Sequence, residues 1–137
     1  MKNLKSKGPF HYDDSENNDL DYKALFEYSN DAIIIHNFNG KIIEANYKVR
    51  DLLALKIERI KLHNFADFLP NRKINIFKKA TKEIKDKGYK KYEIELIKSC
   101  GDFIPVEIRA GLIDENKPIV AAVIRDISII KKQKENL

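Results

Sequence analysis

The chain has 137 residues, of which 43% are hydrophobic and 34% are charged, and its formal net charge is +5. This length suits one domain with a single core and excludes two full domains. The excess of lysine is compatible with an anionic partner, but no arginine cluster or aromatic ladder accompanies it, so a solvated surface is favoured over nucleic-acid binding.

Cysteine content and targeting signals restrict the chemistry further. Cys100 is the only cysteine, which excludes an internal disulfide and a thiolate-rich metal site. The basic residues 1–8 are followed by a polar, acidic stretch, so they do not have the pattern of a signal peptide. We expect no membrane segment in this chain and a cytoplasmic location, because no apolar run is long enough to span a bilayer.

The N-terminal part combines a polar segment with a hairpin. Residues 1–19 contain few apolar side chains, and we expect them to be flexible. Apolar residues at helical spacing then predict a short helix from Leu20 to near Asn30. Two apolar runs, over 32–35 and 42–45, flank Asn39-Gly40, which predicts an antiparallel hairpin with a tight turn at positive φ.

The middle of the chain has helical patterns. Asn46 ends the second apolar run and is predicted to cap a short helix. Residues 62–70 are rich in aromatic and aliphatic side chains, and Pro70 prevents a regular helix from continuing through them. Asn71 is suited to cap the next helix, whose apolar spacing continues to Gly88.

The last third has strand patterns. Apolar and polar residues alternate over 92–96 and over 104–112, which predicts two strands with one buried face each. Residues 119–124 form a continuous apolar run, as in a central strand that is covered on both faces. Because the run over 32–35 has the same character, we predict that these two strands are neighbours. An amphipathic helix begins near Ile127.

The order of these elements, and the residues at their joints, resemble the PAS sensory domain. The matching pieces are Leu25-Phe26-Glu27, Ser29-Asn30-Asp31-Ala32-Ile33, Gly40-Lys41-Ile42-Ile43-Glu44-Ala45-Asn46, Leu52-Leu53-Ala54-Leu55, Gly101, Ile104-Pro105-Val106-Glu107 and Arg125-Asp126-Ile127-Ser128. The chain departs from the family pattern at Cys100, where Asp is common, and at Ser128, where Thr is usual.

The resemblance implies an α+β fold, in which a five-stranded antiparallel sheet has the strand order 2-1-5-4-3. Short helices pack on one face of the sheet, with a small cavity between them. On this basis residues 20–128 form the domain, and residues 129–137 begin a C-terminal linker helix.

The same resemblance implies a non-catalytic sensory or signal-relay module. Such a module binds a small ligand or dimerises, and it passes a conformational change to an output domain such as a histidine kinase or a transcription regulator. We expect a homodimer. The alternative is a purely structural dimerisation or interaction domain with a filled core. A third and less favoured hypothesis is a nucleic-acid binder that uses Lys73, Lys78, Lys79, Lys82, Lys85, Lys90 and Lys91.

The sequence lacks residues that two kinds of cofactor binding in this family require. A thiol adduct with flavin needs a cysteine before the Phe68-Leu69 pair, and Ala66 occupies that position. Non-covalent binding of flavin is compatible with the sequence. Haem is disfavoured because residues 73–87 contain no His, Cys, Met or Tyr to serve as an axial ligand. We expect an apolar or aromatic ligand of unknown identity, since few charges would be buried beside it.

The residues expected to point into the cavity are apolar, so they either line a ligand site or fill the core. The ligand-lining candidates are Ile35, Phe65, Phe68, Leu69, Ile74, Phe77, Ile94, Leu96, Val106, Ile108 and Val123, and Ile33, Ile43 and Ala121 are also expected to point inward.

Polar residues at the joints of the sheet are candidates for signal relay. Asn46 is expected to fix the corner between strand and helix by accepting backbone N–H bonds. Arg125 and Asp126 close the last strand and are placed to grip the exit helix, a joint that couples sheet to output in the family. An ordinary helix cap would use the same atoms.

No enzyme or metal site is predicted. The sequence has no nucleophile paired with a base, no Gly-rich phosphate loop and no metal-ligand spacing. Glu93 and Glu95 share a strand face, where charge pairing with neighbouring strands explains them. Cys100 is expected to be a bystander thiol.

Overall fold

The computed structural model describes residues 22–135. The segment over 1–19 that was expected to be flexible lies outside these residues, as do the first two residues of the predicted N-terminal helix. The elements in chain order are a helix over 22–27, β1 (Ala32–Asn37), β2 (Ile42–Ala45), α2 (Tyr47–Leu53), α3 (Ile57–Ile60), the 3-10 helices η2 (Phe65–Phe68) and η3 (Asn71–Lys73), α4 (Ile74–Lys87), β3 (Tyr89–Ile97), β4 (Phe103–Leu112), β5 (Ile119–Asp126) and α5 (Ser128–Glu135).

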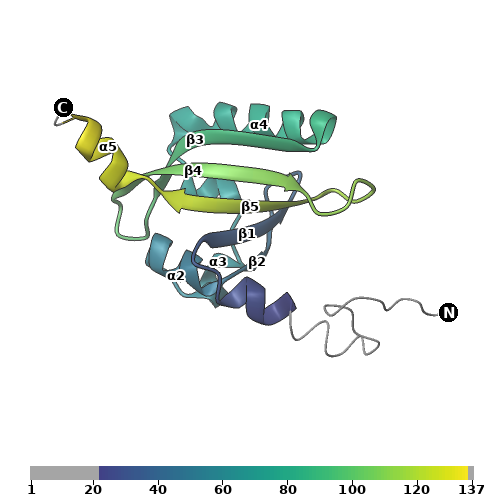
Figure 1. Cartoon of the computed structure of the whole chain (residues 1–137), viewed down its shortest axis with the longest axis horizontal. Helices are drawn as coiled ribbons and strands as arrows, with labels where there is room; N and C mark the ends of the chain where they lie inside the picture. Colours follow the sequence, from purple (N-terminus) through teal and green to yellow (C-terminus); the bar gives the residue numbers. More distant parts are fainter. Residues whose placement is uncertain (1–21, 136–137) are drawn as a thin grey trace.

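The five strands form one antiparallel sheet in the order β2-β1-β5-β4-β3, which confirms the predicted fold (Figure 1). β1 pairs with β5 along its whole length, from Ala32 opposite Ile124 to Asn37 opposite Ile119. The predicted adjacency of these two strands is therefore confirmed. Because α5 follows β5 directly, the first strand borders the strand that leads into the exit helix.

The turn between β1 and β2 is tight, as predicted, because the Gly40 N–H donates to the Asn37 carbonyl at 3.0 Å. Gly40 has a φ of 87°, but Asn39 does not have a positive φ. The side chain of Asn37 also closes the loop, because its Oδ1 accepts hydrogen bonds from the N–H groups of Asn39 and Lys41, each at 2.9 Å. An asparagine that bonds to the backbone just after it is a common way to stabilise such a turn.

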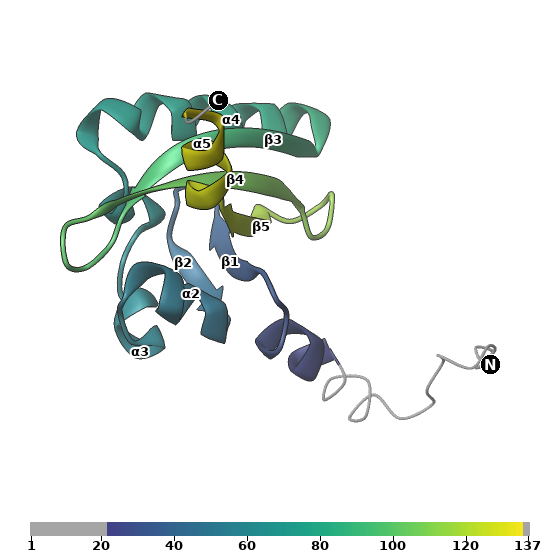
Figure 2. The ribbon, with the colours of Figure 1, turned by 60° about the vertical axis from the view of Figure 1, so that its left-hand side comes forward.

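The helix α4 lies along β3, whereas α2 and α3 lie beside β1 and β2 (Figures 1 and 2). Gly88 ends α4 as predicted, with a φ of 88° and an N–H bond of 2.7 Å to the Ile84 carbonyl. The prediction that Asn71 caps α4 is wrong, because Asn71 begins η3 and Lys73 precedes α4. Pro70 starts this tight turn by accepting a 2.8 Å bond from the Lys73 N–H.

The end of α2 is completed by a distant turn. Ala54 ends the helix with a φ of 56°, in the left-handed region. Ser99, in the turn between β3 and β4, donates its N–H to the Leu53 carbonyl at 2.9 Å and its hydroxyl to the Ala54 carbonyl. These bonds satisfy carbonyl groups that the last turn of a helix leaves free.

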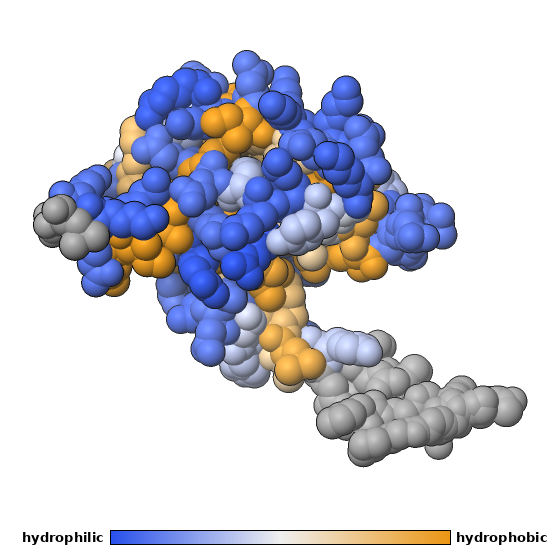
Figure 3. Space-filling model, turned by 45° about the horizontal axis from the view of Figure 1, so that its top comes forward, coloured by the Kyte–Doolittle hydropathy of each residue, from blue (hydrophilic) through white to orange (hydrophobic). Residues whose placement is uncertain are grey.

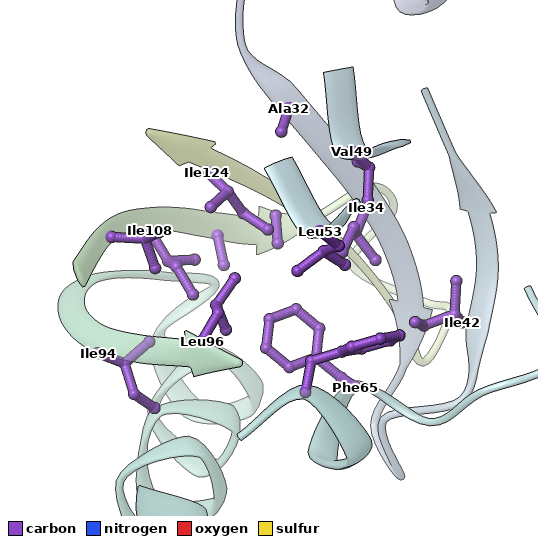
Figure 4. Packing of buried hydrophobic residues seen from close by; sticks show 14 of the residues in the cluster. Ala32, Ile34, Ile42, Val49, Leu53, Phe65, Ile94, Leu96, Ile108 and Ile124 are labelled. Atoms are coloured by element: carbon purple, nitrogen blue, oxygen red, sulfur yellow. The ribbon is translucent and has the colours of Figure 1, made fainter. Parts of the chain in front are cut away.

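The core lies between the sheet and the helices. Figure 4 shows Val49 and Leu53 of α2 directed toward Ile34 of β1, and none of the three is more than 1% exposed. Leu96 and Ile108, from β3 and β4, are equally buried. Full burial of one such side chain contributes about 1.5–3 kcal/mol, so these contacts dominate the stability of the fold.

The side of the central strands that faces the core was predicted wrongly. Ile33, Ile35, Ala121 and Val123 were expected to point inward, but they are only half-buried and lie on the opposite face. The buried residues of these strands are instead Ala32, Ile34, His36, Val120, Ala122 and Ile124. Because both faces of these strands are apolar, the pattern does not indicate which one is inside.

Ile43 in β2 is likewise 38% exposed rather than inward. The face of the molecule that carries α4 and α5 has a largely hydrophilic surface with smaller apolar patches (Figure 3). Within residues 22–135, no helix combines the length and apolarity that crossing a membrane would require.

Candidate ligand groove and exit joint

A solvent-open groove lies between α4, η2 and the turn that follows β1. We call it the α4 groove, and its volume is about 520 Å³. It is lined by Phe38, Asn39, Asn64, Ala66, Ile74, Phe77, Lys78, Thr81, Lys82, Lys85 and Asp86. Ligand sites for small molecules usually occupy about 300–1,000 Å³, so the groove has a suitable size.

Asn64 holds the turn after β1 against η2. Its Nδ2 donates to the Asn39 carbonyl at 2.9 Å, and the N–H of Phe65 donates to the Gly40 carbonyl at 2.7 Å. A Cβ on Gly40 would lie 2.5 Å from Asn64 Oδ1, so this approach requires glycine. The same Oδ1 accepts the Ala66 N–H at 2.9 Å, which caps η2. This wall of the groove is therefore locally preorganised.

Asp67 completes the cap of η2. Its Oδ2 accepts the N–H of Asn64 at 2.9 Å and lies 3.0 Å from Nδ1 of His63. The bond from the Asn64 backbone, together with the smaller effect of His63, lowers the pKa of the Asp67 carboxyl. The capping box was not predicted from the sequence, although Asn64 and Asp67 have the spacing that marks one.

Behind the groove lies a cluster of three aromatic rings. The rings of Phe65 and Phe77 stack with centroids 4.8 Å apart, and His36 lies 5.2 Å and 5.6 Å from them. His36 is buried, and its Nδ1 donates to the Asn37 carbonyl at 2.8 Å. Burial lowers the pKa of His36, so its neutral form is favoured.

The predicted ligand-lining residues divide into three groups. Ile74 and Phe77 line the α4 groove. Ile35 and Val123 lie on the opposite face of the sheet. The others pack in the hydrophobic core, namely Phe65, Phe68, Leu69, Ile94, Leu96, Val106 and Ile108.

The sequence reasoning missed the lysines and Phe38 as groove residues. Lys78, Lys82 and Lys85 were interpreted as part of a solvated helix face, and their exposure agrees with that interpretation. Their spacing was nevertheless a usable signal, because positions i, i+4 and i+7 share one side of a helix. Phe38 directly follows β1, and the prediction for this turn used only Asn39 and Gly40.

Asn46 does not act as the predicted helix cap. It precedes α2, but its side chain makes no bond to the first turn of that helix. Its Oδ1 accepts the N–H of Ile33 at 2.9 Å, and its Nδ2 donates to the carbonyls of Phe26 at 2.8 Å and Asp31 at 3.0 Å. Asn46 therefore joins the helix over 22–27 to the start of β1, and it is completely buried.

Arg125 and Asp126 lie at the same end of the sheet. Oδ1 of Asp126 accepts the N–H of Ser128 at 2.8 Å and its hydroxyl at 2.5 Å, so Asp126 does hold the start of α5. Nε of Arg125 instead lies 3.9 Å from Oδ1 of Asp31, ahead of β1. We call Asp31, Asn46, Arg125, Asp126 and Ser128 the exit joint.

Two further contacts attach α5 to the sheet. Lys131 Nζ lies 3.4 Å from Glu93 Oε1, and the Ile127 N–H donates to the Pro105 carbonyl at 3.0 Å. Glu95 pairs with Arg72 at 2.8 Å. Both strand glutamates are thus paired with cations, but these lie in α5 and η3 and not on the neighbouring strands as predicted, and Glu93 stands opposite Glu107 of β4.

Within residues 22–135, no three His, Cys, Asp or Glu side chains gather closely enough to hold a metal ion. Cys100 is exposed in the turn after β3. The predicted nucleic-acid lysines are spread over η3, α4 and β3, and Lys90 and Lys91 pair with Glu83 and Glu107 at 3.2 and 3.8 Å.

The sequence model of the PAS domain family matches residues 30–128. No curated protein matches the chain. Among solved structures, the chain is similar to the PAS domain of an HTR-like protein from Haloarcula marismortui. The two are 21% identical with a TM-score of 0.72, and the match covers 82% of this chain and 94% of that chain.

Two other similar structures come from regulatory proteins. A domain of a sensory box sensor histidine kinase/response regulator from Geobacter sulfurreducens is 18% identical, with a TM-score of 0.70 over 83% of this chain and 98% of that one. The PAS domain of a LuxR-family transcriptional regulator from Burkholderia thailandensis, in complex with ethanol, is 13% identical, with a TM-score of 0.69 over 78% and 97%. At these identities the likeness concerns the fold.

Proposed function

The chain belongs to the PAS domain family, and on that premise we propose that it is a sensory module whose small-molecule ligand binds in the α4 groove. Ligand occupancy biases the sheet, and the exit joint passes the change through α5 to an output domain such as a histidine kinase or a transcription regulator. The origins of two similar domains, a sensor histidine kinase and a LuxR-family regulator, support an output of this kind.

The observation that carries the proposal is the placement of β1. At its start, Ile33 is bonded to Asn46 of the exit joint. At its end, the chain passes directly into Phe38 and Asn39 of the α4 groove. A ligand that contacts this turn can shift β1 and its partner β5, provided that the sheet has two arrangements with different ligand affinities.

Disulfide crosslinking at the exit helix tests this relay. Ile130 is replaced by Cys in a Cys100→Ser background, and crosslinking between copies is compared before and after extraction of the ligand that native mass spectrometry finds on the protein. We expect the yield to change with occupancy. The exposed position Leu62, replaced by Cys in the same background, is the control and should not respond. Absence of any ligand, or equal yields at Ile130, would contradict the proposal.

A second candidate function is a structural dimerisation domain, and the outward apolar residues favour it. Ile33, Ile35, Ala121 and Val123 are cross-strand neighbours on the face of the sheet away from the core. Apolar side chains on an outer sheet face are typical of a surface that a second copy covers. Sedimentation of the Ile35→Lys variant tests the dimer, since a charge there should shift a dimer to monomers without emptying the α4 groove.

A further inference from the structure

We infer that the ligand of the α4 groove is an amphiphilic anion, a small molecule with one negatively charged head group and an apolar body. The inference rests on the proposed function, because it specifies the ligand of the same groove. It also departs from the expectation of an uncharged ligand, which was based on the buried residues alone.

Three lysines form one wall of the groove. Lys78, Lys82 and Lys85 lie on one side of α4 and span about 10 Å of its axis. Within residues 22–135, no ion pair involves any of the three. Among the described residues, Asp86 is the one acid that lines the groove, so three lysines and one aspartate give this lining a net charge of +2.

In the part of the chain that the structure describes, some lysines beside the sheet have partners and others, such as Lys79 and Lys87 of α4, do not, so this wall is distinguished by the shared concave surface of its three lysines. Lys61 pairs with Glu44 at 3.2 Å, and Lys131 pairs with Glu93 at 3.4 Å. The three groove lysines therefore form a concentrated positive field over a concave surface, where attraction for an anion is stronger than over a flat surface.

The rest of the lining is apolar. Phe38, Ala66, Ile74 and Phe77 provide a surface for a hydrocarbon or aromatic body. The Nζ of Lys85 lies 5.0 Å from the centroid of the Phe38 ring, so positive charge and apolar surface meet within the groove. A ligand that satisfies both surfaces needs a charged end joined directly to an apolar part.

The surroundings favour one negative charge over several. Sites for phosphate chains normally offer backbone N–H groups at a helix N-terminus or in a Gly-rich loop. Here the lysines lie along the body of α4, and no glycine or arginine lines the groove. Asp86 would also repel a second charge.

Titration calorimetry tests the inference on the whole chain with decanoate and decyltrimethylammonium, each below its micelle concentration, and with decanol below its solubility limit. The three probes share a tail and differ in the charge of the head group. We expect decanoate to bind most tightly, with amide NMR shifts confined to residues 38–39, 64–66 and α4. Added salt should weaken decanoate binding and leave decanol binding unchanged.

A matched pair of variants identifies the lysines responsible. Replacing Lys78, Lys82 and Lys85 together by Gln should weaken decanoate binding about tenfold, because exposed ion pairs contribute modestly and add together. The control replaces Lys56, Lys79 and Lys87 by Gln, which removes the same charge from exposed positions outside the groove. The control should keep the affinity for decanoate.

Other results would overturn the inference in distinguishable ways. Equal binding of decanoate and decanol in the groove would reject the anionic head group while leaving the proposed function intact. Equal losses in the two triple variants would show a general charge effect. Binding to phosphatidylglycerol vesicles without binding of free decanoate would indicate a membrane surface instead. No binding of any probe, with no carried-over ligand, would reject both proposals.

Discussion

The two ends of β1 are both organised by an asparagine, but in opposite ways. Asn64, at the groove end, caps its own short helix and fixes the adjacent turn. Asn46, at the joint end, leaves its own helix uncapped and bonds to Phe26, Asp31 and Ile33, which are 20, 15 and 13 positions away. Asn64 thus combines a local cap with one bond that spans 25 positions, whereas every side-chain bond of Asn46 is long-range.

This difference predicts which end is more sensitive to substitution. Asn46 is completely buried, so loss of its side chain leaves backbone groups without partners and without water. Asn64 is half-buried, so water can replace some of the hydrogen bonds that its side chain makes. Substitutions at the joint end should therefore reduce stability more than substitutions at the groove end.

The largest effect is expected for Asn46→Ala. Removing three buried hydrogen bonds should lower the free energy of unfolding by about 3 kcal/mol. Urea denaturation monitored by circular dichroism measures the change. Asn75→Ala, at an exposed position of α4, is the control and should change little. A loss of less than about 1 kcal/mol for Asn46→Ala would mean that the joint is not fixed by this side chain.

Gly40→Ala should have the next largest effect, about 2 kcal/mol, because it adds a steric contact with Asn64 to the strain of a positive φ. Gly101→Ala separates the two causes. Gly101 has a φ of 96°, but no atom lies within 4 Å of the place that a Cβ would take, so only the strain of about 1 kcal/mol applies. If denaturation shows the same loss of unfolding free energy for Gly40→Ala and Gly101→Ala, the contact with Asn64 is unimportant.

Asp67→Asn should cost about 1 kcal/mol at neutral pH, since the carboxylate caps η2. The folded state lowers the pKa of Asp67 from its usual 3.8. Its stabilising contribution is therefore complete above pH 3.8 and is lost as the pH falls further, through the folded-state pKa. Denaturation between pH 6 and pH 3 should show the two proteins converging. A difference between the two proteins that stays constant over this pH range would contradict the role of the Asp67 carboxylate.

The smallest effect is expected for Arg125→Gln. The ion pair with Asp31 is 3.9 Å long and both side chains are exposed, so stability should change by less than about 0.5 kcal/mol. If Arg125 serves signal relay, crosslinking at Ile130 should nevertheless lose its dependence on ligand. Unchanged dependence would exclude Arg125 from the signal relay.

The sheet could be predicted from sequence because its signals are local and repeated. Alternation over 92–96 and 104–112, together with the apolar runs over 32–35 and 119–124, was sufficient for the strands and for the adjacency of β1 and β5, whereas the full strand order came from the resemblance to the PAS domain. The inward face of β1 was not predictable, because Ile33 and Ile34 are equally apolar. Periodicity identifies a buried face only where the other face is polar.

The candidate site was less predictable because it combines residues from separate segments. Ile74 and Phe77 were identified from their helical spacing. Phe38 joins them only because Asn64 draws the turn after β1 against η2, a contact between residues 25 positions apart. The bonds of Asn46 are also long-range. Its position before a helix therefore predicted a cap, whereas its side chain bonds to residues before and in β1.

The bond network at the end of α2 has a consequence for folding. Ser99 bonds to Leu53 and Ala54, and the latter contact spans 45 positions. The last turn of α2 gains these bonds only once the β3–β4 turn has formed, so we expect this short helix to be completed late in folding despite its local sequence. Amides near Leu53 should then exchange with solvent only when the sheet itself opens, so that their protection reports on strands far along the chain.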